Sequence, residues 1–515
     1  MEQVVGNDDE ILSHSINPLI LLLSTTLLLI LLMSCHLKTK KTGAAAAFPL
    51  PPGPWKLPII GNIHQLALSP NSGLVHRSFA ALAMQYGPVM QLKLGETWNV
   101  VVSSPEAARE LLKTHDLNFS ARPYMPSASI IFYDGRDISF SPEGDYWRRM
   151  RKICTTELLT EKRVKSLRPI REDEVRKLVK LIAGSGGGAV NLSQLLISVA
   201  NAMTSRAAFG KIRELDGAFL PLMHRITQKL GGFTLGDIFP SHRWLHQITG
   251  TERQLKKLHT EADAMIQEII DDHLSRRAAG TRKETDDQQD LVDVLLDYTD
   301  DHIEVKAIIL DIFLAGGDTS PTILEWVMAE LMKNPKEMEK VQTEVRGVFD
   351  TKGKAVDEAY FDELYYFKSV VKETFRLHPP VPLSIPKEAR EMVVIAGYQI
   401  PEKTRVIVNS WAIGRDPAHW TYPDQFIPER FLDTSIDYKN NDFQFIPFGA
   451  GRRICPGMNY GLALVYLLLV NLLYHFDWKL PNQIKPQELD MSEEFGATIV
   501  RKNNLYLIPI PYHAP

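Results

Sequence analysis

Cysteine is scarce in this sequence: its 515 residues contain only three, Cys35, Cys154 and Cys455, and they stand far apart. So few cysteines exclude a disulfide framework and suit a reducing compartment. The chain also lacks an excess of either charge, because 58 basic and 62 acidic side chains leave a net charge of −4. Nucleic-acid-binding domains usually carry a basic excess, so nucleic acid is not the expected partner.

Two sequence patterns are missing as well. The chain shows no internal repeat, and no G-x-G-x-x-G segment follows a strand-like run. That segment is the usual sign of a dinucleotide site, because its glycines let the backbone approach a pyrophosphate. The chain therefore has no recognisable nicotinamide or flavin site, and any redox reaction here would draw its electrons from a separate protein.

Residues 16–37 form an almost wholly apolar run without a charged side chain. About 20 apolar residues are needed to cross a bilayer as a helix, so this run predicts a transmembrane anchor. Lys38, Lys40 and Lys41 follow at once, and positive residues favour the cytosolic side. We therefore predict that residues 1–15 form a lumenal tail and that the bulk of the chain faces the cytosol.

The alternative is a cleaved signal peptide with its cleavage site at residues 44–47. It fits less well, because a signal peptide has a basic start and a shorter apolar core, whereas residues 1–15 are polar and acidic. The glycosylation sequons at Asn118 and Asn191 test this topology. With the domain in the cytosol neither is glycosylated, and a sugar on either would overturn the prediction.

Residues 48–55 read FPLPPGPW, and proline stiffens a chain by fixing φ. We assign residues 38–58 to a basic and proline-rich linker and residues 59–515 to one large domain. Helix-like patterns dominate that domain. Its strand-like runs are short, at residues 89–94, 99–102, 392–394 and 405–408. The expected fold class is therefore mainly α with small β-sheets.

One cysteine lies in a glycine-rich decapeptide, residues 448–457, just before an apolar run that predicts a helix. Gly449 and Gly451 allow backbone angles that a side chain forbids, and they let the backbone lie against a flat group. Beside Arg453, in a turn rich in N–H groups, Cys455 would be stabilised as a thiolate, the form that binds a metal. The alternative is a buried, inert cysteine in a turn that caps a helix.

This decapeptide resembles the haem-binding signature of the cytochrome P450 family, F-x-x-G-x-R-x-C-x-G. Its fixed positions are all filled, by Phe448, Gly451, Arg453, Cys455 and Gly457. The likeness is continuous from residue 48 to residue 515. It implies the cytochrome P450 fold and a haem b (iron protoporphyrin IX) whose iron is bound by Cys455, so that residues 59–515 form a haem-binding catalytic domain.

Residues 305–333 predict a long helix that carries the sequence AGGDTSP at its middle. Each glycine inside a helix costs about 1 kcal/mol relative to alanine, and Pro321 cannot donate to the carbonyl of Gly317. We therefore expect the helix to open or kink there, with the Thr319 hydroxyl and the Asp318 carboxylate at the gap. A glycine packing notch with a capping Asp-Thr pair is the alternative.

The same stretch resembles the family motif [AG]-G-x-[DE]-T-[ST]. In the family this gap accepts O2. The resemblance therefore implies that Asp318 and Thr319 are catalytic, with Thr319 hydrogen-bonding oxygen or a water and Asp318 relaying protons from solvent.

Trp147 and Arg151 are four residues apart and so share a face of a helix. By resemblance, such a W-x-x-x-R pair reaches a haem propionate. The neighbouring Arg148, Arg149 and Lys152 lie on other faces. They form either a solvated surface or a basic dock for an acidic redox partner, and the sequence leaves both interpretations open.

Glu373 and Arg376 form an E-x-x-R pair, and residues 428–431 read PERF. In the family the pair joins the arginine of such a segment, which implies a buried charge set of Glu373, Arg376 and Arg430 that fixes the cysteine loop. Lys387 departs from the Pro-Arg-Glu sequence that is common in plant members. Lysine keeps the charge but not the fork of donors, so the cation that meets a propionate there stays open.

Several apolar segments are candidates for a substrate pocket, although apolar stripes are more often core. The candidates are Ile131, Phe132, Phe313, Ala315, Val381, Leu383, Ile385 and Thr498. Together they favour a lipophilic small molecule. The overall pattern resembles plant microsomal members of specialised metabolism and, among these, terpenoid (sesqui- or diterpene) oxygenases.

The resemblance implies a monooxygenase at the endoplasmic reticulum membrane, anchored by a single span with its catalytic domain in the cytosol. O2 is the co-substrate, and electrons come from NADPH through a membrane-bound reductase, with cytochrome b5 as a further candidate donor. Alkaloid or phenolic hydroxylation stays open. So do a non-oxygenating haem-thiolate lyase or isomerase, against which the intact Asp318–Thr319 pair argues, and a membrane protein with a structural cysteine and no haem.

Overall fold

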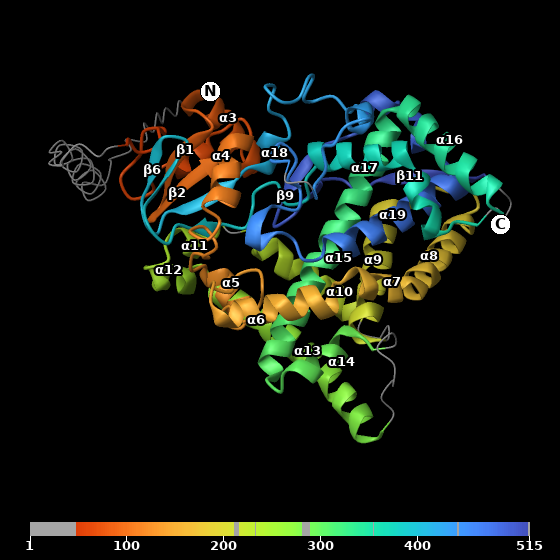
Figure 1. The fold of residues 1–515 in the computed structure, drawn as a ribbon, viewed down its shortest axis with the longest axis horizontal. Helices are drawn as coiled ribbons and strands as arrows, with labels where there is room; N and C mark the ends of the chain where they lie inside the picture. The colour runs from red at the N-terminus through yellow and green to blue at the C-terminus, as the bar shows by residue number, and fades with distance from the viewer. Residues whose placement is uncertain are drawn as a thin grey trace, which may run out of the picture.

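The computed structural model describes residues 48–210, 216–231, 233–280, 289–353, 355–439 and 442–512. The predicted lumenal tail, the predicted anchor and most of the linker lie outside these residues. Figure 1 shows that helices fill most of the molecule, while strands β1, β2 and β6 gather at the end nearest the first described residues. The architecture is therefore mainly α with small β-sheets, as the sequence predicted.

Helices carry most of the described chain. They are α2 Ile63–Ala67, α3 Val75–Tyr86, α4 Pro105–Arg109, α5 Pro126–Ile131, α6 Asp145–Ile153, α7 Glu161–Ser166, α8 Arg168–Ala183, α9 Leu192–Phe209, α10 Asp216–Lys229, α11 Leu235–Ile238, α12 Arg243–Ile248, α13 Thr251–Ala278, α14 Leu291–Tyr298, α15 His302–Lys333, α16 Pro335–Thr351, α17 Tyr365–Leu377, α18 Ser410–Ile413 and α19 Met458–His475. The strands are β1 Val89–Leu94, β2 Thr97–Val102, β3 Val190–Asn191, β4 Lys387–Glu388, β5 Val393–Ile395, β6 Tyr398–Ile400, β7 Arg405–Val408, β8 Phe476–Lys479, β9 Glu493–Phe495, β10 Ile499–Arg501 and β11 Tyr506–Pro511.

The largest sheet has the strand order β1-β2-β7-β4. β1 and β2 form an antiparallel hairpin, and β2 pairs in parallel with β7. Valine and isoleucine fill β2 and β7, as expected for buried strands. Gly95 closes the hairpin at φ +58°, and a Cβ added there would lie 2.5 Å from a methyl carbon of Ile238. Glycine therefore lets the α11 segment pack against this turn.

α15 crosses the centre of the molecule (Figure 1) and packs against α9, α13, α17 and α19. Asp301 caps its first turn by accepting from the N–H of Ile303, and the helix ends before Pro335, which begins α16. α19 is the apolar helix predicted after the cysteine decapeptide. Both helices are long and apolar enough to cross a membrane, but most of their surface is buried inside the protein. We therefore interpret them as core helices.

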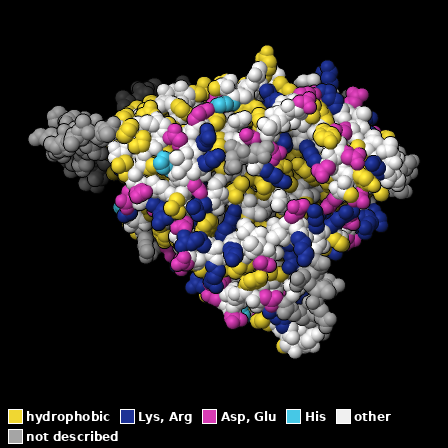
Figure 2. Space-filling model, viewed as in Figure 1, with side chains coloured by type: hydrophobic (Ala, Val, Ile, Leu, Met, Phe, Trp, Pro, Cys, Tyr) yellow, Lys and Arg dark blue, Asp and Glu magenta, His cyan; other side chains and the backbone are white. Residues whose placement is uncertain are grey.

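The surface carries both charge signs. Figure 2 shows Lys and Arg side chains interleaved with Asp and Glu over the visible face, with apolar side chains between them. This mixture agrees with the near balance of 58 basic and 62 acidic residues.

Candidate active site

The cysteine loop is shaped by its glycines. Gly449 and Gly451 adopt φ angles of +69° and +71°, in the left-handed region that favours glycine. A Cβ added to Gly451 would lie 2.4 Å from Oδ1 of Asp116, so the loop can pack there only without a side chain. The backbone N–H of Cys455 donates to the carbonyl of Phe448 at 3.0 Å and closes the loop.

The Cys455 side chain is accessible although the protein around it is dense. Burial raises the pKa of its thiol, whereas the backbone N–H of Gly457 and the positive charge of Arg151 lower it. Those two contacts favour the thiolate, which is the metal-binding form. Cys154 differs, because it is fully buried and burial raises the pKa of its thiol to about 12. It is an inert core cysteine.

Four cations lie near one another at this loop: Arg122, Arg151, Arg453 and Lys387. In the part of the chain that the structure describes, none of them forms an ion pair with a carboxylate. Burial and the charge of Arg453 lower the pKa of Arg122 to about 9. Lys387 is 4% exposed, and burial followed by the charges of Arg122 and Arg453 puts its pKa well below the usual range.

Buried cations without a carboxylate partner are costly, so this cluster fits an anionic ligand. The donor set as a whole is one accessible thiol and a surplus of positive charge. It fits haem, whose iron takes a thiolate ligand and whose propionates are negative. Lys387 belongs to this cluster, and a contact between Lys387 and a propionate stays a prediction.

Trp147 and Arg151 project from α6 toward the loop. The indole N–H of Trp147 donates to the carbonyl of Ile138 at 3.0 Å, and the guanidinium of Arg453 lies 4.1 Å from the centre of the indole ring. Arg151 donates to the carbonyl of Ile454. By resemblance, the Trp147–Arg151 pair was expected to reach a haem propionate, and that contact stays a prediction. Within the protein, the indole ring of Trp147 packs against Arg453 and its N–H has the carbonyl of Ile138 as partner.

The basic residues on the other faces of α6 are mostly paired within the chain. Arg148 pairs with Glu143, and Arg149 pairs with Glu304. Lys152 is exposed. A dock for a redox partner on this face therefore stays a prediction.

Glu373 and Arg376 on α17 contact each other twice at 2.7 Å, and both side chains are fully buried. Arg430 from the PERF segment donates to Glu373 at 3.2 Å. Arg376 also donates to three backbone carbonyls of the segment that leads to PERF. The ring of Phe375 lies 5.1 Å from that of Phe448. The three charges therefore meet, as predicted, and join α17 to the approach of the cysteine loop.

α15 is one unbroken helix through Pro321, so the helix does not break at this sequence, and a kink there stays a prediction. Pro321 leaves the carbonyl of Gly317 without a backbone donor, and Nδ2 of Asn201 on α9 lies 3.4 Å from that oxygen. A Cβ on Gly317 would lie 2.5 Å from Oδ1 of Asn201, so glycine permits this approach. The hydroxyl of Thr319 donates to the carbonyl of Ala315 at 2.8 Å.

Asp318 contacts a segment almost two hundred residues further along the chain. The hydroxyl of Thr498, between β9 and β10, donates to Oδ2 of Asp318. Burial raises the pKa of Asp318, while Thr498 and the charge of His224 lower it. A raised pKa lets a carboxyl group hold a proton closer to neutral pH, as a proton relay requires. The structure thus joins the predicted relay residue to a predicted pocket residue.

A cavity of about 190 Å³ adjoins this part of α15. Of the predicted pocket residues, its walls include Phe132, Ala315, Val381, Leu383, Ile385 and Thr498, together with Asp318 and Thr319. Two predictions were wrong. Phe313 faces the core, where its ring packs against Phe209 and Phe219 with centroids 5.9 and 4.7 Å away. Ile131 is fully buried in the core and is not part of the wall.

The sequence analysis missed three polar residues at this cavity: Arg122, Ser139 and Asp311. Ser139 and Asp311 line the wall, and Arg122 donates to the carbonyl of Ser139 at 2.7 Å. Asp311 carried a usable signal, because a charged residue in an apolar helix is seldom buried without a partner. Arg122 and Ser139 lie in irregular segments, where no periodicity marks them.

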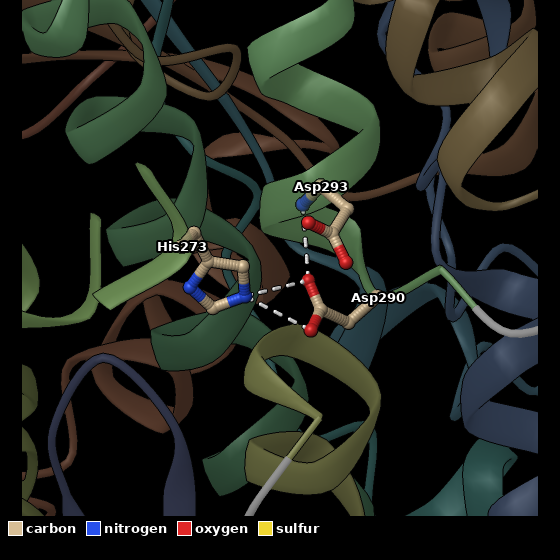
Figure 3. A group of neighbouring side chains, drawn as sticks. All are labelled: His273, Asp290 and Asp293. Carbon is tan, nitrogen blue, oxygen red and sulfur yellow. Dashed lines mark hydrogen bonds and ion pairs between the residues drawn. The ribbon is translucent and has the colours of Figure 1, made fainter. Parts of the chain in front are cut away.

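A separate group of possible metal ligands, His273, Asp290 and Asp293, lies where α13 meets α14 (Figure 3). Nε2 of His273 is 2.9 and 3.0 Å from the two oxygens of Asp290, which also accepts from the N–H of Asp293 at 3.0 Å. The guanidinium of Arg276 lies 2.9 Å from the same nitrogen of His273. A cation so close disfavours a metal ion, and we interpret the group as a helix cap.

The chain matches the family model "Cytochrome P450" over residues 51–508. Desmethyl-deoxy-podophyllotoxin synthase of Sinopodophyllum hexandrum is 49% identical, with 90% of this chain and 92% of that protein covered. Premnaspirodiene oxygenase of Hyoscyamus muticus is 46% identical, with 92% and 95% covered. Salviol synthase of Salvia pomifera is 45% identical, with 92% and 94% covered.

A solved structure, a zebrafish cytochrome P450 with progesterone, has 25% sequence identity and a TM-score of 0.71, and the match covers 85% of this chain and 99% of that one. The fold is therefore shared with a distant animal protein. The family match extends over most of this chain and includes the cysteine loop, the buried charge set and α15. This chain belongs to the cytochrome P450 family and is a haem-thiolate monooxygenase.

Proposed function

We propose that this enzyme hydroxylates a lipophilic plant metabolite of the terpenoid class, a sesquiterpene or diterpene. The observation that carries the proposal is the cavity beside α15, whose walls are mostly apolar and which borders Asp318 and Thr319. Apolar walls select a ligand by shape and by the burial of its hydrocarbon surface. The likeness to premnaspirodiene oxygenase and to salviol synthase supports a terpenoid in this cavity.

The chain's own residues hold the cofactor and supply protons. Haem b, bound through the Cys455 thiolate, supplies the activation of O2, because a thiolate ligand favours cleavage of the O–O bond. Arg122 and Arg453 would provide the positive charge that the propionates need, with Lys387 beside them. Asp318 is the proton carrier, because burial raises the pKa of its carboxyl group, and Thr498 holds that group on the cavity wall.

The electrons come from NADPH through a separate reductase, with cytochrome b5 as a second donor. No dinucleotide fingerprint occurs in the sequence, which is consistent with an external source. The basic face of α6 is the proposed dock, and Lys152 is exposed in its last turn.

We place the enzyme on the endoplasmic reticulum membrane, with residues 16–37 as a single span and the catalytic domain in the cytosol. Large apolar side chains on the described surface support this, since Trp55, Ile59, Trp244 and Ile248 are all more than half exposed. Two segments carry these side chains, and both border the β1–β2 hairpin. In the first segment, Lys56 lies 4.2 Å from the centre of the Trp98 ring. Just before the second, the carbonyl of Ile238 accepts from the backbone N–H of Glu96.

The experiment is co-expression of the full chain with a plant reductase in yeast, followed by feeding with premnaspirodiene, a diterpene panel, and alkaloid and phenolic scaffolds. We expect a terpenoid product that gains one oxygen atom, with label from ¹⁸O₂ and a strict need for NADPH. The Cys455→Ser variant is the matched control and should give no product.

Two outcomes would redirect the proposal. Oxidation of phenolic or alkaloid scaffolds alone would overturn the terpenoid assignment, and the podophyllotoxin-type relative makes this the stronger alternative. Conversion without NADPH or O2 would point to a lyase or isomerase.

A further inference from the structure

Two buried aspartates from distant parts of the chain bind the same short turn. Oδ2 of Asp137 accepts hydrogen bonds from the N–H groups of Ser139 at 3.1 Å and Phe140 at 2.8 Å. Oδ2 of Asp311, on α15, accepts from the N–H groups of Ile138 and Ser139, both at 3.1 Å. Its Oδ1 accepts from the Ser139 hydroxyl at 2.7 Å. The turn is therefore held between two carboxyl groups.

These carboxyl groups are close together and out of water. Both Oδ2 atoms lie 3.1 Å from the nitrogen of Ser139, so they are at most twice that distance apart. Asp137 is fully buried, and Asp311 is 5% exposed. Burial disfavours each charge, and two ionised carboxylates so close repel each other. Burial, followed by the charge of Asp311, raises the pKa of Asp137 to about 8, and burial also raises the pKa of Asp311.

The nearby cations do not neutralise the pair by direct contact. Arg122, Arg453 and Arg151 lie close enough to attract it. Their guanidinium groups, however, donate to backbone carbonyls. Within the described ranges, neither Asp137 nor Asp311 takes part in an ion pair. A single proton is therefore the means by which the pair avoids two buried negative charges.

The hydrogen bonds place that proton on Asp137. Both oxygens of Asp311 accept hydrogen bonds, as an ionised carboxylate does. Oδ1 of Asp137 is buried and has no hydrogen-bond partner. A buried oxygen without donors tolerates a neutral O–H group better than a charge.

We propose that Asp137 and Asp311 are positioning residues that hold residues 138–140 against α15 and thereby fix one wall of the substrate cavity. Ser139 and Phe140 line that cavity, as does Asp311 itself. The inference rests on the proposed use of this cavity for substrate, but the protonated pair can be tested without any substrate.

The same turn connects the cavity wall to the cofactor cluster. The carbonyl of Ile138 accepts from the indole N–H of Trp147 at 3.0 Å and from Arg453 at 3.1 Å. A movement of the turn would therefore disturb both the substrate wall and the residues that face the haem.

The shared proton gives this turn a pH dependence of definite sign. The native state keeps a proton that the unfolded chain releases near pH 4, the ordinary pKa of aspartate. The stability that the pair confers therefore falls as the pH rises from about 4 to about 8, and it is level above that. The other titratable groups that face the pair are Tyr146, Cys154 and Cys455, and burial raises the pKa of each from an ordinary value that already lies above this range.

The test compares Asp137→Asn and Asp311→Asn with the wild type as haem-loaded full chains. Asp145→Asn is the matched control, because Asp145 is fully exposed in the nearby α6. Infrared spectroscopy at neutral pH reports the C=O band of a protonated carboxyl group. The apparent melting temperature, measured between about pH 5 and 9, reports how the shared proton changes stability with pH. The affinities of clotrimazole and imidazole for the haem report the cavity wall, since only the bulky azole reaches it.

We expect Asp137→Asn to lose the protonated-carboxyl band. The melting temperature of this variant minus that of wild type should increase as the pH rises to about 8, because only wild type loses the stability of the shared proton. Wild type should lose clotrimazole affinity several-fold relative to imidazole above that pH, and Asp137→Asn should not. Asp311→Asn should lower the melting temperature at all pH values, because a carboxylate that binds three donors is lost. An unchanged band, or a melting difference that is flat with pH, would overturn the inference whether or not the enzyme oxidises terpenoids.

Discussion

At the scale of single residues, one side chain, Thr498, affects the pKa of the proposed proton carrier, Asp318. Thr498 gives its hydroxyl proton to Asp318, so Thr498→Val removes a donor that lowers the pKa of that carboxyl group. We expect product per NADPH to fall several-fold, peroxide release to rise, and the acid limb of the activity profile to move to higher pH. The reduced, carbon-monoxide-bound spectrum should stay normal. Thr498→Ser keeps the hydroxyl and should behave as wild type; equal coupling in the two variants would contradict the role.

A second prediction at this scale concerns Glu373, which is fully buried and paired with Arg376 and Arg430. Removing one member of a buried ion set leaves uncompensated charge and costs about 3–5 kcal/mol. We expect Glu373→Ala to yield protein without haem rather than a slow enzyme, as shown by the loss of the Soret band. Glu429→Ala is the control, because Glu429 pairs with Lys340 at the surface of the same PERF segment. A normal haem spectrum from Glu373→Ala would refute this.

Residues within contiguous motifs could be predicted, whereas contacts between distant segments could not. Cys455 was predicted from its decapeptide, and the Glu373 charge set was inferred by resemblance from two short motifs. Asp137 and Asp311 stand apart by more than a third of the chain, and neither belongs to a motif. The turn that joins them depends on side-chain-to-backbone hydrogen bonds, which leave no periodic trace in a sequence.

At the scale of elements, α15 shows how a helix accommodates a proline. The carbonyl of Gly317 loses its backbone donor to Pro321 and receives Nδ2 of Asn201 instead. Asn201→Ala should cost about 1–3 kcal/mol, because a buried carbonyl is left unsatisfied. In a Pro321→Ala background the backbone N–H of residue 321 can donate to the carbonyl of Gly317. Asn201→Ala should therefore cost about 1 kcal/mol less in that background. The double-mutant cycle, measured by thermal unfolding, gives this coupling; additive effects would show that Asn201 has no such role.

Long periodic elements were predictable, and short ones were not. The sequence indicated α15 and α19 because their apolar character continues over several turns. The amide that approaches the freed carbonyl of Gly317 comes from α9, and the sequence of α15 does not reveal it. β9 and β10 have three residues each, too few to show alternation, although the link between them carries Thr498 to Asp318.

At the scale of the whole molecule, the resemblance indicated the fold, and packing decided which side chains reach the cavity. Phe313 and Ala315 are two positions apart on α15, yet Phe313 faces the core and Ala315 the cavity. Helical geometry separates two such positions by about 200°. The sequence could not show which of the two faces turns toward the cysteine loop, because that depends on how α9 and α19 pack on α15.

The membrane contact of the whole molecule is the last prediction. A protein that begins at residue 48 keeps every described contact, so it should bind haem normally. Trp244 and Ile248 on α12 are 53% and 76% exposed, and burying such a side chain contributes roughly 1.5 kcal/mol or more. The shortened protein should therefore still bind neutral lipid vesicles, and Trp244→Ser with Ile248→Ser should abolish that binding in a sedimentation assay. Tyr365→Ser is the control, because Tyr365 is 69% exposed on α17, away from the β1–β2 hairpin. Equal sedimentation of the double variant and the control would show that the anchor alone holds the enzyme to the membrane.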